Sequence, residues 1–134
     1  MAALVYVSES SSSVSSGSTE LGSVMVMDTE VSGVTDNNLI VVGGSCINTV
    51  AASLLGSDSP MCGTDFTDKT GVDTGSFLIE TFTSPFSDSK VATLVAGFDA
   101  SDTTNAVTYL KTQDVSTAVG DKYVGTSATS ATLV

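Results

Sequence analysis

The chain has 134 residues, 41% of them hydrophobic, and carries 15 acidic residues against four lysines, a formal net charge of −11. This length and hydrophobic content predict one domain over residues 1–134 with its own core. The negative charge repels phosphate backbones, so we expect no nucleic acid partner. Histidine and arginine are absent, so most familiar hydrolase and transferase mechanisms lose a part, although lysine, carboxylates and thiols remain.

No apolar run approaches the roughly 20 residues that span a bilayer, so we expect no direct membrane span. The first ten residues lack the basic segment of a secretory signal. Two locations stay open, the cytoplasm and the extracellular side. The apolar ending at residues 131–134 favours the second, with the chain as a fragment of a longer secreted protein.

The N-terminal third predicts short strands around a polar segment. Leu4–Val7 is a β-type run, and residues 8–19 are mostly serine, which is typical of a flexible loop or linker. Val24–Met27 is a continuous apolar run that predicts a strand buried on both faces.

Asn38–Val42 is the strongest strand signal, and Gly43-Gly44 ends it. From Ser45, a good N-cap, the apolar spacing becomes helical. The predicted buried stripe consists of Cys46, Ile47, Val50, Ala51, Leu54 and Leu55, and Gly56 is placed as a C-cap glycine.

Residues 57–74 are predicted to be an irregular surface segment, and Ser76–Phe82 a strand. Val91–Ala96 repeats the earlier pattern: Gly97 ends the strand, and Asp99 or Ser101 caps a helix. That helix is predicted to bury Ala106, Val107 and Leu110.

Two strand-glycine-helix units in sequence predict an α/β fold: a small, mostly parallel sheet with right-handed crossovers and the units packed in layers. The tail around Lys122-Tyr123-Val124 is expected to add an antiparallel edge strand.

The C-terminal ends of parallel strands share one sheet edge, which is where α/β proteins bind ligands. The candidate residues at this edge are Asp28, Glu30, Gly43, Gly44, Asp99 and Asp102. Their oxygens suit a hard cation such as calcium, although Asp99 and Asp102 also fit a helix-capping role. The glycines do not match a dinucleotide fingerprint, which favours a turn over nucleotide binding. We expect no other cofactor and no metal site beyond this edge.

Cys46 and Cys62 are the only cysteines. A disulfide between them is favoured if the protein is extracellular, and two free thiols are expected in the cytoplasm. A thiolate in the first turn of the predicted helix would be stabilised, but no histidine is present to activate it.

The segments Asp28–Glu30, Asn38–Gly56 and Val95–Ala106 together resemble archaeal surface-layer (S-layer) proteins. In that family an NLIVVGG strand and a VAGxxxxDT turn recur in this order near the end of the chain. Ser45 departs from the proline that often follows the double glycine. The resemblance implies a structural domain of a secreted cell-envelope protein, with other copies or domains of the same protein as partners and no catalysis. A module that binds a small ligand, a cation or a carbohydrate remains the alternative.

Overall fold

The computed structural model describes residues 4–8 and 24–134. Seven strands within this part form one sheet, in the order β2-β1-β3-β5-β4-β6-β7. They are β1 (Leu4–Ser8), β2 (Val24–Met27), β3 (Asn38–Val42), β4 (Phe77–Thr83), β5 (Val91–Gly97), β6 (Lys122–Ser127) and β7 (Ser130–Leu133). The predicted serine-rich linker lies outside the described residues, except for Ser8, which ends β1.

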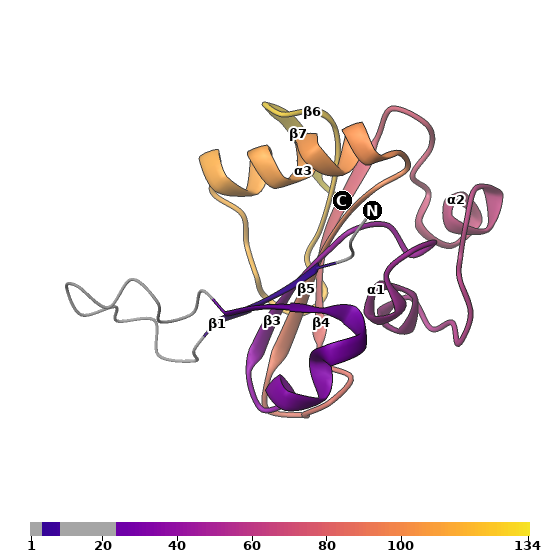
Figure 1. Ribbon diagram of the computed structural model, residues 1–134. Coiled ribbons are helices and arrows are strands. Elements are labelled where there is room, and N and C mark those ends of the chain that lie inside the picture. The colour runs from indigo at the N-terminus through magenta and orange to yellow at the C-terminus, as the bar shows by residue number, and fades with distance from the viewer. Residues whose placement is uncertain (1–3, 9–23) are drawn as a thin grey trace.

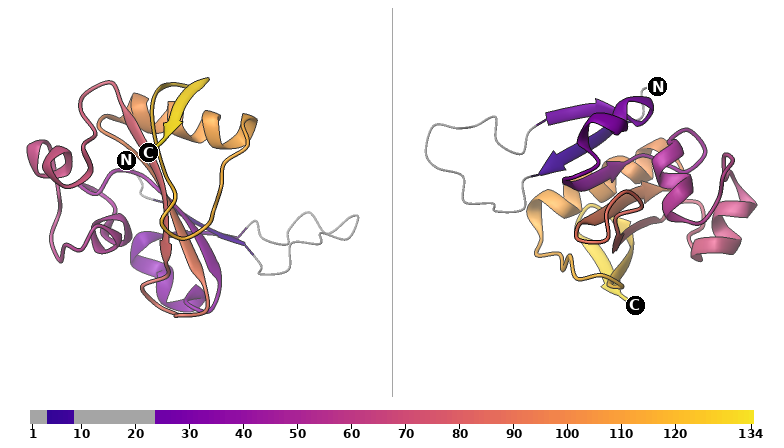
Figure 2. Two further views of the ribbon diagram at one scale, coloured as in Figure 1. Left: turned by 180° about the vertical axis from the view of Figure 1, so that it is seen from behind. Right: turned by 90° about the horizontal axis from the view of Figure 1, so that it is seen from below.

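Helices cover both faces of this sheet (Figures 1 and 2). They are the 3-10 helix η1 (Asp28–Val34), α1 (Thr49–Leu54), α2 (Thr64–Thr70) and α3 (Ala100–Thr112). On one face, Leu39, Val41, Leu78 and Leu94 pack with α1 and α2 residues such as Val50 and Phe66. On the other, Phe77, Ile79 and Val95 pack against Ala106 and Tyr109 of α3. The central strands β3 and β5 are therefore covered on both faces, which explains their largely apolar sequences.

The predicted mostly parallel sheet is wrong. Among the described strands only β3 and β5 pair in parallel, and the other pairs, β1–β2, β1–β3, β4–β5, β4–β6 and β6–β7, are antiparallel. The segment between β4 and β5, residues 84–90, is too short for the crossover that parallel neighbours need. β4 therefore returns as a hairpin partner of β5, and the strand-glycine-helix units supply only the single parallel pair.

Two helix predictions also change. α1 begins at Thr49 with Asn48 as N-cap, not at Ser45, because residues 44–48 form a turn closed by hydrogen bonds from the Ile47 and Asn48 amides to the Gly44 carbonyl. Ile47 therefore lies outside the buried stripe and is 48% exposed. The segment predicted to be irregular contains α2, which buries Phe66 and Thr70.

Several local predictions are confirmed. Gly56 has the positive φ of +85° expected after a helix, and the Gly56 and Ser57 amides donate to the Ser53 and Ala52 carbonyls, as in a Schellman motif. Asp99 is the N-cap of α3. The tail around Lys122–Val124 forms the predicted antiparallel strand, β6, but β6 lies between β4 and β7, and β7 is the edge strand. The strand predicted to be buried on both faces, β2, instead lies at the other edge of the sheet, where Val26 and Met27 are half-buried.

Gly97 marks the tightest contact between a strand and a helix. A Cβ atom added there would lie 2.2 Å from the Thr103 amide nitrogen and 2.4 Å from the Asp102 Cβ atom. The Gly97 amide also donates to the Thr103 Oγ1 atom at 2.9 Å. The first turn of α3 therefore rests directly on the end of β5, a position that only glycine permits.

We predict that Gly97→Ala destabilises the domain by about 1–3 kcal/mol, because the new methyl group must displace helix backbone. Urea unfolding followed by circular dichroism measures this loss. Gly33→Ala is the matched control, since a Cβ atom at Gly33 meets nothing within 4 Å. Equal stability of the Gly97→Ala variant and the wild type would contradict the close approach.

Candidate functional site

The chain leaves β3 and β5 toward opposite faces of the sheet. α1 packs on the face formed by Leu39 and Val41, whereas α3 packs on the face that includes Val95. Adjacent parallel strands whose connections diverge in this way define a topological switch point, and a crevice opens outside their carboxyl ends. This arrangement makes the end of the β3–β5 pair the first place to look for a binding site.

A cleft of about 520 Å³ lies at this switch point. We call it the switch-point cleft; it is lined by Val42, Gly43, Gly44, Cys46, Ile47, Gly97, Phe98, Asp99, Ala100, Thr103, Thr104 and Val107. Its volume falls within the range of small-molecule sites, and its lining is mostly apolar. Phe98 is its one aromatic residue, so it offers little of the stacking surface expected of a carbohydrate site.

The structure brings only part of the predicted edge into this cleft. The strand register aligns the ends of β2, β3 and β5, because Leu4 pairs with both Met27 and Val42, and Val42 pairs with Val95. Yet only three of the six predicted residues, Gly43, Gly44 and Asp99, line the cleft. The other three, Asp28, Glu30 and Asp102, have hydrogen-bonded roles in the framework.

Asp28 holds the start of α1. Its Oδ2 atom accepts hydrogen bonds from the backbone amide and the hydroxyl of Thr49, both at 2.8 Å, and its side chain is buried. The Asn48 Oδ1 atom accepts from the next two amides, those of Val50 and Ala51, at 3.0 and 3.1 Å. The first three amides of α1 therefore all point at protein oxygens.

These contacts bear on the nucleotide alternative. A phosphate at the turn after β3 would need free amides at the start of the following helix. Here a carboxylate and an amide oxygen from Asp28 and Asn48 already accept those bonds. Gly43 has a φ of +124°, and its amide extends the sheet by donating to the Val95 carbonyl at 3.0 Å. The double glycine thus serves as a turn.

Asp102 and Glu30 also accept hydrogen bonds from backbone amides at the start of a helix. The Asp102 Oδ2 atom accepts from the amides of Asp99 and Gly75 at 3.0 and 3.1 Å, which ties the start of α3 to the loop before β4. The Glu30 Oε1 atom accepts from the Met27 amide at 3.2 Å, at the start of η1.

Within the described residues, no group of three or more cysteine or acidic side chains is placed to hold a metal ion. The calcium expectation therefore gains no support.

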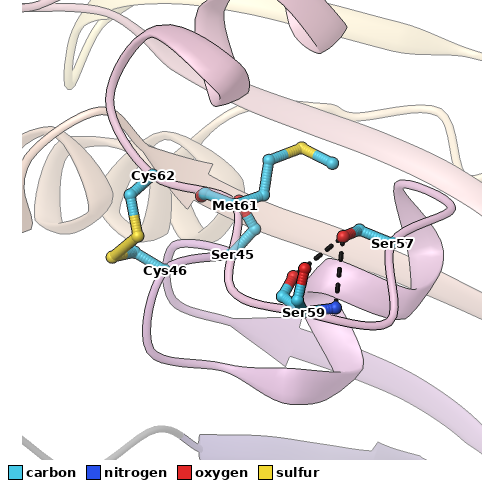
Figure 3. Close-up of a disulfide and its surroundings, with 6 residues drawn as sticks. All are labelled: Ser45, Cys46, Ser57, Ser59, Met61 and Cys62. Atoms are coloured by element: carbon cyan, nitrogen blue, oxygen red, sulfur yellow. Dashed lines mark hydrogen bonds between the residues drawn. A yellow bond between two sulfur atoms is a disulfide. The ribbon is translucent and has the colours of Figure 1, made fainter.

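The disulfide between Cys46 and Cys62 is present, with the two Cα atoms 4.6 Å apart (Figure 3). Two hydrogen bonds beside it join the same segments: the Ser45 hydroxyl donates to the Met61 carbonyl at 2.7 Å, and the Met61 amide donates to the Ser45 carbonyl at 3.1 Å. Both cysteines are exposed. Cys46 is not in a helix, so the predicted helical stabilisation of a thiolate does not apply.

Glu80 is an ionisable residue that the sequence did not single out. It lies in β4, opposite Lys122 of β6. Burial raises its pKa, and the nearby charges of Lys122 and Lys69 offset this rise only in part. The Lys122 Nζ atom donates to the Thr70 carbonyl at the end of α2, at 2.7 Å. Glu80 does not line the switch-point cleft, so its raised pKa reflects its position in the sheet.

No family model matches the chain, and no curated protein or solved structure matches it either. In the part of the chain that the structure describes, no helix is both long enough and apolar enough to cross a membrane. Function must therefore be inferred from the chain's own residues.

We predict that Asp28→Ala destabilises the domain by about 1–3 kcal/mol, because the buried Asp28 carboxylate, which accepts two part-buried hydrogen bonds from Thr49 at the start of α1, is lost. Chemical denaturation monitored by circular dichroism measures the change. Asp36→Ala removes the same charge from an exposed turn and should alter the free energy of unfolding by less than about 0.5 kcal/mol. Similar losses in both variants would point to net charge instead of the hydrogen bonds.

Glu80 should make stability depend on pH. Because its pKa is raised above 4.5 in the folded state, folding favours the protonated form, and this contribution is lost as the pH rises through the raised value. Glu80→Gln mimics the protonated form, so we expect a higher melting temperature than wild type at pH 7 and no difference at pH 3.

Differential scanning calorimetry at the two pH values tests this expectation. Asp88→Asn removes an exposed charge from the loop between β4 and β5 and controls for the change in net charge. A Glu80→Gln variant that is less stable than wild type at pH 7 would show that the attraction of the lysines outweighs burial.

Proposed function

We propose that this chain is a structural, non-catalytic domain of a secreted protein that forms part of a cell envelope, as its resemblance to archaeal surface-layer proteins implies. The observation that carries the proposal is the exposed Cys46–Cys62 disulfide. Disulfides persist in oxidising compartments and are rare in the cytosol, where thiols are kept reduced. The disulfide therefore favours the extracellular of the two locations that the sequence left open.

The use of the acidic side chains supports a framework role. Asp28 and Asp102, the two buried carboxylates among the described residues, each accept two hydrogen bonds. The donors belong to Thr49 at the start of α1, to Asp99 at the start of α3 and to Gly75 beside it. An enzyme needs ionisable groups that converge on one cleft, with pKa values suited to proton transfer. The switch-point cleft is lined by a single acid, Asp99, and Glu80 lies elsewhere.

The surface charge supports an exposed position as well. Most of the 15 acidic residues lie at exposed positions, and a large net negative charge keeps a protein soluble and resists nonspecific binding to anionic surfaces. On this proposal the partners are other copies or domains of the same envelope protein.

Labelling of intact cells tests the location. An antibody raised against the purified chain should stain unpermeabilised cells of the organism that carries the gene, and nonreducing mass spectrometry of the native protein should find Cys46 bonded to Cys62. An antibody to a cytoplasmic protein of the same cells serves as the control for leakage. Staining only after permeabilisation, or free thiols at both positions in the native protein, would overturn the proposal.

A further inference from the structure

The switch-point cleft has an apolar body. Val42, Phe98 and Val107 are half-buried around it, and Ile47 extends the apolar surface at 48% exposure. These side chains come from β3, the turn before α1, the residue that follows β5, and α3, so residues far apart in sequence form one surface. Burying such a surface under an apolar ligand is favourable by roughly 25 cal/mol per Å² of area removed from water.

The polar side chains of the cleft differ in their availability. The Thr103 hydroxyl accepts from the Gly97 amide at 2.9 Å, and the Thr104 hydroxyl donates to the Ala100 carbonyl at 3.2 Å. Asp99 is exposed and is the one lining residue with a formal charge, and its carboxylate also faces the Asp102 amide in the capping box of α3. A ligand in the cleft therefore meets apolar side chains on most sides and a carboxylate on one.

The charged residues around the switch-point cleft determine whether a positively or a negatively charged ligand is favoured. None of the four lysines lines the cleft. The start of α3 carries a partial positive charge, but Asp99 and Asp102 place two carboxylates there, and the net charge of −11 also disfavours anions. A hard metal cation would need several oxygen ligands, and the cleft offers one carboxylate. An organic cation needs only one opposite charge beside an apolar surface.

We infer that the switch-point cleft binds a small amphiphilic amine, with its hydrocarbon part against Ile47, Phe98 and Val107 and its ammonium group beside Asp99. This binding activity goes beyond the structural role proposed above and does not depend on it.

Phenethylamine is a suitable probe, with phenethyl alcohol as the neutral analogue and hydrocinnamate as the anionic one. Amide chemical shifts of the oxidised protein, followed by NMR during titration, should change first at Gly43, Gly44 and Gly97. We expect the amine to bind about two- to five-fold more tightly than the alcohol, the range of an exposed ion pair, and hydrocinnamate to bind most weakly.

Two variants test separately the contribution of the Asp99 charge and that of the apolar surface to binding. Asp99→Asn retains a good N-cap for α3 and should reduce amine affinity to that of the alcohol. Val107→Ser should weaken the amine and the alcohol alike, because it removes apolar contact from both. Asp114→Asn is the matched control, since it removes one charge from an exposed position beyond the end of α3 and should leave amine affinity unchanged.

Three results would overturn the inference. The first is the absence of shift changes at the three glycines when the amine is in large excess. The second is binding of hydrocinnamate as tight as that of the amine. The third is an equal loss of amine affinity in Asp99→Asn and Asp114→Asn, which would show attraction to the overall charge and no defined site.

Discussion

The rest of the fold is arranged around the parallel pairing of β3 with β5. Both strands are covered by side chains on their two faces, and Val41, Leu94 and Val95 are fully buried between the helix layers. Parallel neighbours cannot be joined by a tight turn, so the chain between them must travel over the sheet. In this protein that path contains α1, α2 and β4. The antiparallel strands widen the sheet on both sides of the β3–β5 pair.

The acidic residues near this pair act mainly as partners for backbone amides. Helix starts expose amides that need acceptors, and they favour negative charge. Asp28 accepts a hydrogen bond from the Thr49 amide of α1, 21 residues away in sequence. Asp102 accepts hydrogen bonds from the Asp99 amide at the start of α3 and from the Gly75 amide. Three of the four acids that the sequence places at strand ends, Asp28, Glu30 and Asp102, are engaged by hydrogen bonds within the protein. Asp99 lines the switch-point cleft.

The sequence predicts the local units better than their assembly. The apolar run before Gly97 and the acid at position 99 identify β5, its end and the start of α3, because each feature depends on neighbouring residues. Strand direction depends on connection length, and the short segment between β4 and β5 was a signal for a hairpin. Ser45 and Asn48 are both good capping residues, so only the Asp28–Thr49 contact and the turn at Gly44 decide where α1 begins.

The sequence likewise predicts only some of the residues that line the candidate site. Gly43, Gly44 and Asp99 were predicted from their positions at strand ends and line the switch-point cleft. Phe98, Val107 and Ile47 were not predicted as lining residues, because Val107 and Ile47 were assigned to buried helical faces. Their place in the cleft depends on α1 and α3 leaving the sheet on opposite sides, and nothing in the local sequence specifies which face a helix will cover.

The disulfide has a consequence for proteolysis of the domain. Cys46 and Cys62 close a covalent ring that contains α1 and the exposed segment around Ser57 and Ser59 (Figure 3). Cleavage of one peptide bond inside this ring leaves both pieces of the chain attached through sulfur. The central strands β3 and β5 would then remain parts of one molecule, and the cut would not convert the domain into two fragments that can diffuse apart.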